Sequence, residues 1–202
     1  MGKYHFHQAS PVPIAAVNTP SSGEPAMATT SALLTEVLKE AARKQYHRAI
    51  ALSTRKGGQE LSVINARGVC LMRIGKIDEA VTLFRNLVLQ PGCIWMRKDR
   101  PAFYKYNFAT ALLLSGRPAG CLDVLRELGA QDPPTAGVLR AAIKRWESTL
   151  PLWNWLDWKL YGSAPSDRPV LIDFEPGDFG CEVILPSAGP GGNQSTPPRN
   201  AA

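Results

Sequence analysis

Apolar and polar residues alternate at helical period through the middle of the chain. Between Ile64 and Pro91 the apolar positions form two stripes on either side of Gly75, which predicts two amphipathic helices that meet at this glycine. Asp78 and Glu79 fall in the first turn of the second helix, where carboxylates suit the positive end of the helix dipole. Pro91 ends that helix because proline has no backbone N–H to donate. The pattern therefore predicts a helical hairpin.

The order of small and large residues in this hairpin recurs downstream. The spacings are 7, 5 and 4 residues in both copies, which are Gly68, Gly75, Ala80, Phe84 and then Ala109, Gly116, Cys121, Leu125. This order resembles the tetratricopeptide repeat (TPR), a helix–turn–helix unit of about 34 residues. We predict TPR-like units at residues 61–91 and 102–133. The copies lie 41 residues apart (109 − 68), so the extra residues must fall in the connection Gly92–Pro101.

The segments that flank these units predict further helices. Ser31 can cap a helix that is followed by a second one over Tyr46–Arg55. This hairpin can be a degenerate first repeat, in which Lys44 stands where the connecting glycine is expected. After the second unit, a helix capped by Thr135 carries an apolar stripe that ends at Trp146. We expect this helix to cover the exposed end of the array.

A short, very aromatic helix is predicted after Pro151, over the sequence LWNWLDWKLYG. It is apolar nearly all round, so we expect it to be buried on more than one side and to pack on the repeats. Two alternatives remain open. One is self-association through Trp153, Trp155 and Trp158. The other is a membrane-surface anchor, which the near absence of Lys and Arg on a polar face disfavours.

The C-terminal region combines short β-branched runs with turn residues. Arg168–Phe174 and Cys181–Leu185 flank the turn sequence Glu175–Asp178, which predicts either a hairpin or an extended arm laid along the helices. Both chain ends are rich in Pro, Gly and Ser and predict disorder. The predicted all-α organisation comprises a tail (1–30), a TPR-like helical array (31–149), the aromatic helix and arm packed on the repeats (150–185) and a second tail (186–202).

Charge and cysteine content restrict the class of protein only modestly. The net charge of +6 favours acidic partners without naming one. The four cysteines show no metal-ligand spacing, which fits a reducing compartment, and we expect no metal or other cofactor. No secretory signal and no membrane-spanning run is predicted. We expect a cytoplasmic, bacterial protein.

Catalytic motifs are not recognisable in the sequence. His5 and His7 lie in a predicted tail and His47 lies on the polar side of a helix, so nothing places a base beside a nucleophile. We expect a protein that is not an enzyme and has no small-molecule substrate.

The resemblance to TPR proteins implies where a partner would bind. In that family the first helix of each repeat lines a concave groove that holds a peptide. The implied groove residues are Asn65, Val69, Met72, Arg73, Tyr106, Asn107, Thr110 and Leu113. Asparagine amides can bond to the backbone of an extended peptide, and Arg73 can pair with a carboxylate. The resemblance thus favours a scaffold that binds a protein or peptide, acidic ones included. The alternative is an ordinary solvated helix face.

The connection between the units offers a second binding hypothesis. Its basic insert contains Trp95, Arg97, Lys98 and Arg100, and basic and aromatic residues together can grip nucleic acid. A contiguous patch that includes Arg67 or Lys105 would favour this reading, whereas a loop folded on the core with solvated charges would not.

Overall fold

The computed structural model describes residues 32–55, 58–129 and 134–180. The predicted tails, the capping role of Ser31 and the segment Cys181–Leu185 lie outside the described residues, as do His5 and His7. Within the described ranges the fold is all helical, as the sequence predicted, and no strand is present. The helices are α1 (Ala32–Ala42), α2 (Tyr46–Ser53), α3 (Leu61–Arg73), α4 (Ile77–Val88), α5 (Ala102–Leu114), α6 (Pro118–Leu128), α7 (Pro134–Glu147) and α8 (Leu152–Tyr161).

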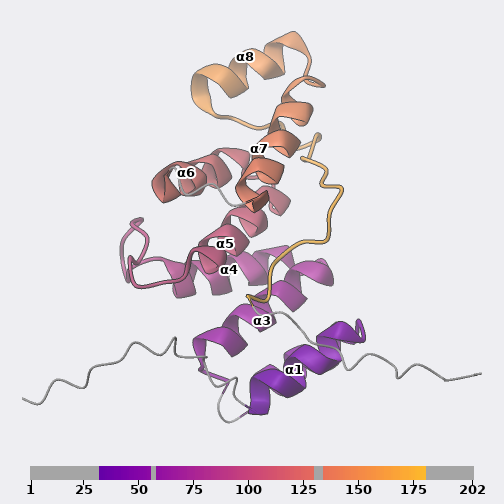
Figure 1. Cartoon of the computed structure of the whole chain (residues 1–202). Coiled ribbons are helices and arrows are strands. Elements are labelled where there is room, and N and C mark those ends of the chain that lie inside the picture. Colours follow the sequence, from indigo (N-terminus) through magenta and orange to yellow (C-terminus); the bar gives the residue numbers. More distant parts are fainter. Residues whose placement is uncertain (1–31, 56–57, 130–133, 181–202) are drawn as a thin grey trace, which may run out of the picture.

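Three antiparallel hairpins stack one on the next to form the array (Figure 1). They are α1–α2, α3–α4 and α5–α6, and the second helix of each also packs against the first helix of the next hairpin. The insert between α4 and α5 accounts for the longer spacing of the second and third hairpins. The helical array predicted from the periodicity is therefore confirmed.

All three hairpins turn through the same backbone motif. Gly75 and Gly116 have φ values of 79° and 75°, and Lys44 takes the same left-handed conformation with φ of 59°. In each turn this residue donates its N–H to the carbonyl three residues earlier, and the next residue donates to the carbonyl five residues earlier. This is the Schellman helix terminus. The first hairpin thus shares its turn with the other two, although it lacks the glycine.

Replacing Lys44 with glycine should stabilise the protein. A side chain in the left-handed region costs about 1 kcal/mol or more, and the extra freedom of glycine in the unfolded chain offsets only part of the gain. We expect Lys44→Gly to increase the free energy of unfolding by about 0.5 kcal/mol, which corresponds to a rise of roughly 1–2 °C in melting temperature. Thermal unfolding would measure it, with Gly75→Ala as the matched variant of opposite sign. A lower melting temperature for Lys44→Gly would contradict the claim that the left-handed conformation of Lys44 is strained.

A close approach of two helices organises the core. Gly68 of α3 faces the ring of Phe84 of α4, and a Cβ at position 68 would lie 2.5 Å from a ring carbon. Phe84 is fully buried. One apolar cluster runs from α3 to the arm that follows α8, and a smaller one joins α1, α2 and α3. Because α3 contributes to both clusters, it connects the first hairpin to the rest of the array.

The basic insert buries one of its side chains against the array, that of Met96. Met96 is buried, pairs with Leu89 in an isolated antiparallel bridge and donates its N–H to the carboxylate of Glu127 on α6. Trp95 points away from the core and is 64% exposed. The alternative for this insert, a loop in which Trp95 and Met96 fold back on the core, therefore holds for Met96 and is wrong for Trp95, since the bridge turns alternate side chains to opposite sides.

The helices after the third hairpin differ from the sequence predictions in two respects. Helix α7 begins at Pro134, so Thr135 lies within its first turn and does not precede the helix as a cap. Helix α8 buries only Trp158, whereas Trp153 is 75% and Tyr161 79% exposed. The prediction that the aromatic helix is buried on more than one side is wrong for the single chain. Self-association stays a prediction for Trp153 and Trp155, whereas Trp158 is buried within the single chain and is not available for it.

Helix α8 is attached to α7 through Trp158 and Lys159. The rings of Trp146 and Trp158 meet edge to face at 5.2 Å between centroids. The Trp158 indole N–H donates to one oxygen of Glu147 at 2.6 Å, and Lys159 donates to the other at 2.8 Å. Burial by itself would raise the pKa of Glu147. The hydrogen bonds from Lys159 and Trp158 outweigh this effect and hold the pKa below its ordinary value.

Acid should therefore loosen the contact between α7 and α8. Because the folded-state pKa of Glu147 is lowered, its stabilisation is complete above the ordinary pKa of about 4.5 and is lost as the pH falls through the folded pKa. Tryptophan fluorescence should change below about pH 4.5. The Glu147→Gln variant, which cannot ionise, should lack this transition. Equal titrations of the two proteins would contradict the role of the carboxylate.

Candidate peptide-binding site

The polypeptide that follows α8 returns along the array in an extended conformation. This segment, residues 163–180, is here called the arm, and it runs from beside α7 down to α3 (Figure 1). Near its start Trp146 donates its indole N–H to the Arg168 carbonyl, and further on Arg145 pairs with Asp173 at 2.8 Å. Over the described residues 163–180, the chain takes the extended alternative of the two conformations predicted for this region. The residues of α2, α3 and α5 that contact its end are here called the arm site.

Two buried asparagines hold the main chain at the end of the arm. Asn65 of α3 donates to the carbonyls of Asp178 and Phe179 at 3.1 and 3.3 Å. Asn107 of α5 donates to the Asp178 carbonyl and accepts from the Asp178 N–H, at 2.7 and 2.8 Å. Asn107 also donates to the Asn65 side-chain oxygen at 2.7 Å. Every N–H of both amides is thus used, and the main chain of the arm satisfies most of the hydrogen-bonding capacity of these buried groups.

Arg73 completes the main-chain contacts and adds contacts to side chains. Its guanidinium donates to the carbonyls of Pro176 and Gly177 at 3.1 and 3.3 Å and pairs with Glu175 at 3.0 Å. It also lies over the ring of Phe179, 4.7 Å from the centroid. The Arg73 side chain is only 13% exposed. A cation shielded to this degree interacts more strongly with a carboxylate and an aromatic ring than one in open water.

Tyr46, the first residue of α2, binds the same carboxylate from the neighbouring hairpin. Its hydroxyl donates to Glu175 at 3.0 Å, and Arg73 lies 5.7 Å over its ring. Burial and the hydrogen bond to Glu175 raise the pKa of Tyr46 above its ordinary value, so the hydroxyl keeps its proton at neutral pH. Sequence reasoning missed Tyr46 because an aromatic residue at the start of a helix is an ordinary packing residue.

The predicted groove residues divide into two groups. The Asn65, Asn107 and Arg73 side chains bind the arm, and Val69 and Met72 lie directly under Gly177. Thr110 lines a small cavity beside the arm but donates its hydroxyl to the Tyr106 carbonyl of its own helix. Tyr106 and Leu113 are buried in the main apolar cluster. The alternative of a solvated helix face is wrong, because Asn65 and Asn107 are buried beneath the arm.

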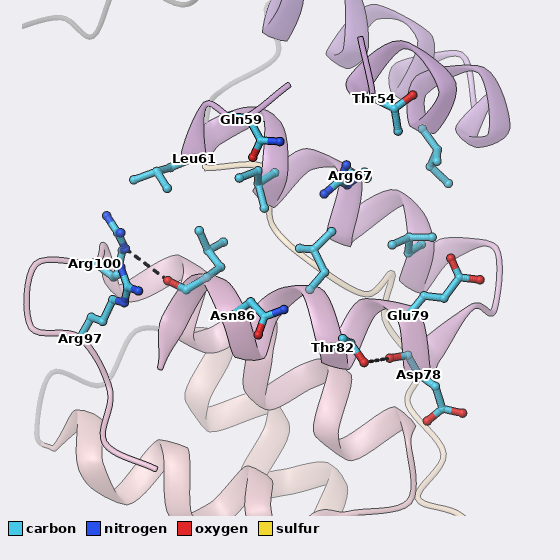
Figure 2. A pocket seen from close by; sticks show the side chains of 15 residues that line it. Thr54, Gln59, Leu61, Arg67, Asp78, Glu79, Thr82, Asn86, Arg97 and Arg100 are labelled. Carbon is cyan, nitrogen blue, oxygen red and sulfur yellow. Dashed lines mark hydrogen bonds between the residues drawn. The ribbon is translucent and has the colours of Figure 1, made fainter. Parts of the chain in front are cut away.

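A cleft on another face brings part of the basic insert together with Arg67. It has a volume of about 890 Å³ and lies between α2, α3 and α4, with Arg67, Arg97 and Arg100 among its lining residues (Figure 2). Arg97 and Arg100 each donate Nε to a carbonyl at the end of α4, those of Leu89 and Leu87. Asp78 and Glu79 line the same cleft, whereas Lys98 and Lys105 do not. The cleft is thus of mixed charge.

The remaining features to consider in the described part of the chain are reactive thiols, metal sites and membrane-spanning helices. Burial raises the pKa of Cys70 and of Cys121 to about 12, so neither thiol is ionised at neutral pH. No cluster of three or more His, Cys, Asp or Glu side chains is placed to bind a metal within residues 32–55, 58–129 and 134–180. Among the described helices, none has both the length and the apolar character needed to cross a membrane.

Comparisons with known proteins leave the site to be interpreted from its own geometry. No protein-family model matches the chain, and searches of curated proteins and of solved structures found no significant match. The TPR resemblance therefore rests on the repeated residues and on the shared turn.

Proposed function

We propose that this chain is a non-enzymatic, TPR-like protein-interaction module that binds an extended peptide segment of a partner protein at the arm site. The observation that carries the proposal is the way the arm itself is held. Asn65, Arg73 and Asn107 make six hydrogen bonds to its main chain between Pro176 and Phe179. Every peptide has main-chain N–H and C=O groups, and hydrogen bonds to the main chain are how several peptide-binding folds obtain affinity.

The arm occupies the site intramolecularly, so a partner must replace it. A tethered segment competes with an effective concentration in the millimolar range. A partner at micromolar concentration therefore binds well only when it makes better contacts or when the arm has been released. This favours a role as a scaffold whose binding site is opened when the partner arrives.

A photo-crosslinking experiment tests the proposal. Position 138 is suitable because Val138 is 40% exposed and lines the cavity beside the arm. The full-length chain would carry benzoylphenylalanine there, together with Gly177→Val to release the arm. In nuclease-treated native lysate we expect a crosslink to one segment of a partner protein. The matched control adds Asn65→Ala and Asn107→Ala and should lose the crosslink. Crosslinks that are insensitive to the two asparagines would argue against the proposal.

Nucleic-acid binding at the basic insert is the second candidate function. The observation that favours it is the convergence of Arg67, Arg97 and Arg100 on one cleft. Binding through phosphates would weaken steeply with salt. Titration with a labelled oligonucleotide at two salt concentrations, using the wild type and Arg67→Gln, would test it. Binding unaffected by salt or by Arg67→Gln would remove this candidate.

A further inference from the structure

We infer that the arm site selects peptides in which a carboxylate side chain stands two residues before a glycine and an aromatic side chain two residues after it. This inference rests on the function proposed above and names the class of peptide that the site accepts. The sequence Glu175-Pro176-Gly177-Asp178-Phe179 is then the chain's own copy of the ligand. Each of the three selected positions follows from a separate contact.

The carboxylate position is defined by two donors from different helices. Glu175 binds the Arg73 guanidinium at 3.0 Å and the Tyr46 hydroxyl at 3.0 Å. A charged and a neutral donor that converge on one carboxylate form a small receptor for an acidic side chain. A lysine at this position would place a second cation beside the shielded Arg73, so the site disfavours basic residues here.

The glycine position is defined by close packing and by backbone conformation. Gly177 has φ of 85°, a region that side-chain-bearing residues rarely adopt. A Cβ there would lie 2.7 Å from the Met72 methyl and 2.9 Å from both Val69 methyls. Met72 and Val69 are themselves buried. The backbone can therefore reach the floor of the site only where the peptide has no side chain.

The aromatic position is defined by Arg73 and by the junction between the hairpins. The ring of Phe179 lies against the guanidinium of Arg73 and packs on both apolar clusters of the array. An aromatic residue here covers the seam between the first and second hairpins. Asp178 between the glycine and the aromatic residue uses its carboxylate within the arm, as the acceptor for the Gly180 N–H. That contact fixes the conformation of the peptide and does not contribute to its recognition by the site.

A peptide with the sequence of residues 172–180 provides the test, because it presents the three positions without the tether. A fluorescein-labelled version would be titrated into the full-length wild type and into the full-length Gly177→Val variant. The variant should release its own arm, since a β-branched side chain fits neither the backbone conformation nor the packing at position 177. We expect Gly177→Val to bind the peptide at least about 10-fold more tightly than the wild type, because the tethered competitor is gone.

Altered peptides then test each position on the Gly177→Val protein. Glu175→Lys, Gly177→Val and Phe179→Ala in the peptide should each weaken binding about 10-fold or more, and a scrambled peptide should not bind. Circular dichroism would check that the variant chain is folded. Asp178→Pro, which removes the N–H that Asn107 accepts, is a second full-length variant that frees the arm.

The outcomes separate this inference from the proposed function. If hydrogen exchange shows the arm released, but the peptide does not bind or the scrambled peptide binds equally, the selectivity is overturned. A crosslinked partner segment without the carboxylate, glycine and aromatic order would overturn the selectivity and leave the proposed function standing. Selective peptide binding with no crosslinked partner would support the selectivity and count against an external partner.

Discussion

Placing a methyl group on Gly68 should destabilise the array by about 3 kcal/mol, because an overpacked helix contact cannot relax without moving a buried ring. A Cβ at this position would lie 2.5 and 2.7 Å from two ring carbons of Phe84. Phe84 is fully buried, so its ring has no free space to move into. The helices α3 and α4 would have to separate, which would also disturb the face of α3 that carries Asn65 and Arg73.

Chemical denaturation of Gly68→Ala measures this effect. Gly137→Ala is the matched control, because a Cβ at Gly137 of α7 meets no atom within 4 Å. The free energy of unfolding of the control should increase by up to about 1 kcal/mol, because alanine has a better helix propensity than glycine. Adding Phe84→Leu to Gly68→Ala should recover part of the loss by making room for the methyl group. Equal stability of Gly68→Ala and the wild type would show that the two helices do not approach so closely.

Replacing Asn107 with leucine should release the end of the arm. The substitution removes the acceptor for the Asp178 N–H and the donor for the Asp178 carbonyl, and it leaves Asn65 without its amide partner. Loss of the two hydrogen bonds to the arm, which leaves buried polar groups unsatisfied, costs about 2–3 kcal/mol. That corresponds to roughly a 100-fold larger population of the open arm.

Native-state hydrogen exchange at the Asp178 N–H reports this opening directly. We expect the exchange rate to rise about 100-fold in Asn107→Leu, provided that opening of the arm limits exchange. Thr110→Val is the control, one turn further along α5, because the Thr110 hydroxyl bonds to its own helix and not to the arm. It should leave the exchange rate within about threefold of the wild type. Unchanged exchange in Asn107→Leu would show that the amide does not hold the arm.

The helices and their turns could be predicted because their causes are local. The spacing of Gly68, Gly75, Ala80 and Phe84 fixes which residues meet within one hairpin, and the glycine permits the left-handed turn. Sequence reasoning also placed Lys44 at the position of the missing glycine. That Lys44 adopts the glycine-like conformation could not be predicted, since the packing of α1 against α2 imposes it on a residue that disfavours it.

Sequence reasoning could predict the helix residues that form the candidate site, but not the segment that occupies it. The resemblance to TPR proteins implied that Asn65, Arg73 and Asn107 share a binding face, and these side chains do bind the main chain of the arm. The hypothesis that the site binds another protein stays a prediction. Tyr46 and the occupant of the site were missed, because no periodic pattern links Tyr46 to Glu175 across 129 residues.

By itself, the sequence determined the helical hairpins and the glycine turns of the second and third hairpins. These depend on residues a few positions apart, where periodicity and backbone preference act directly. Tertiary structure alone decided that the arm lies across that face and that most of α8 remains exposed. Both outcomes depend on which distant surfaces are complementary in shape and hydrogen bonding. Asn65 and Asp178 meet across 113 residues only because the stacked hairpins bring Asn65 and Asn107 together beneath the arm.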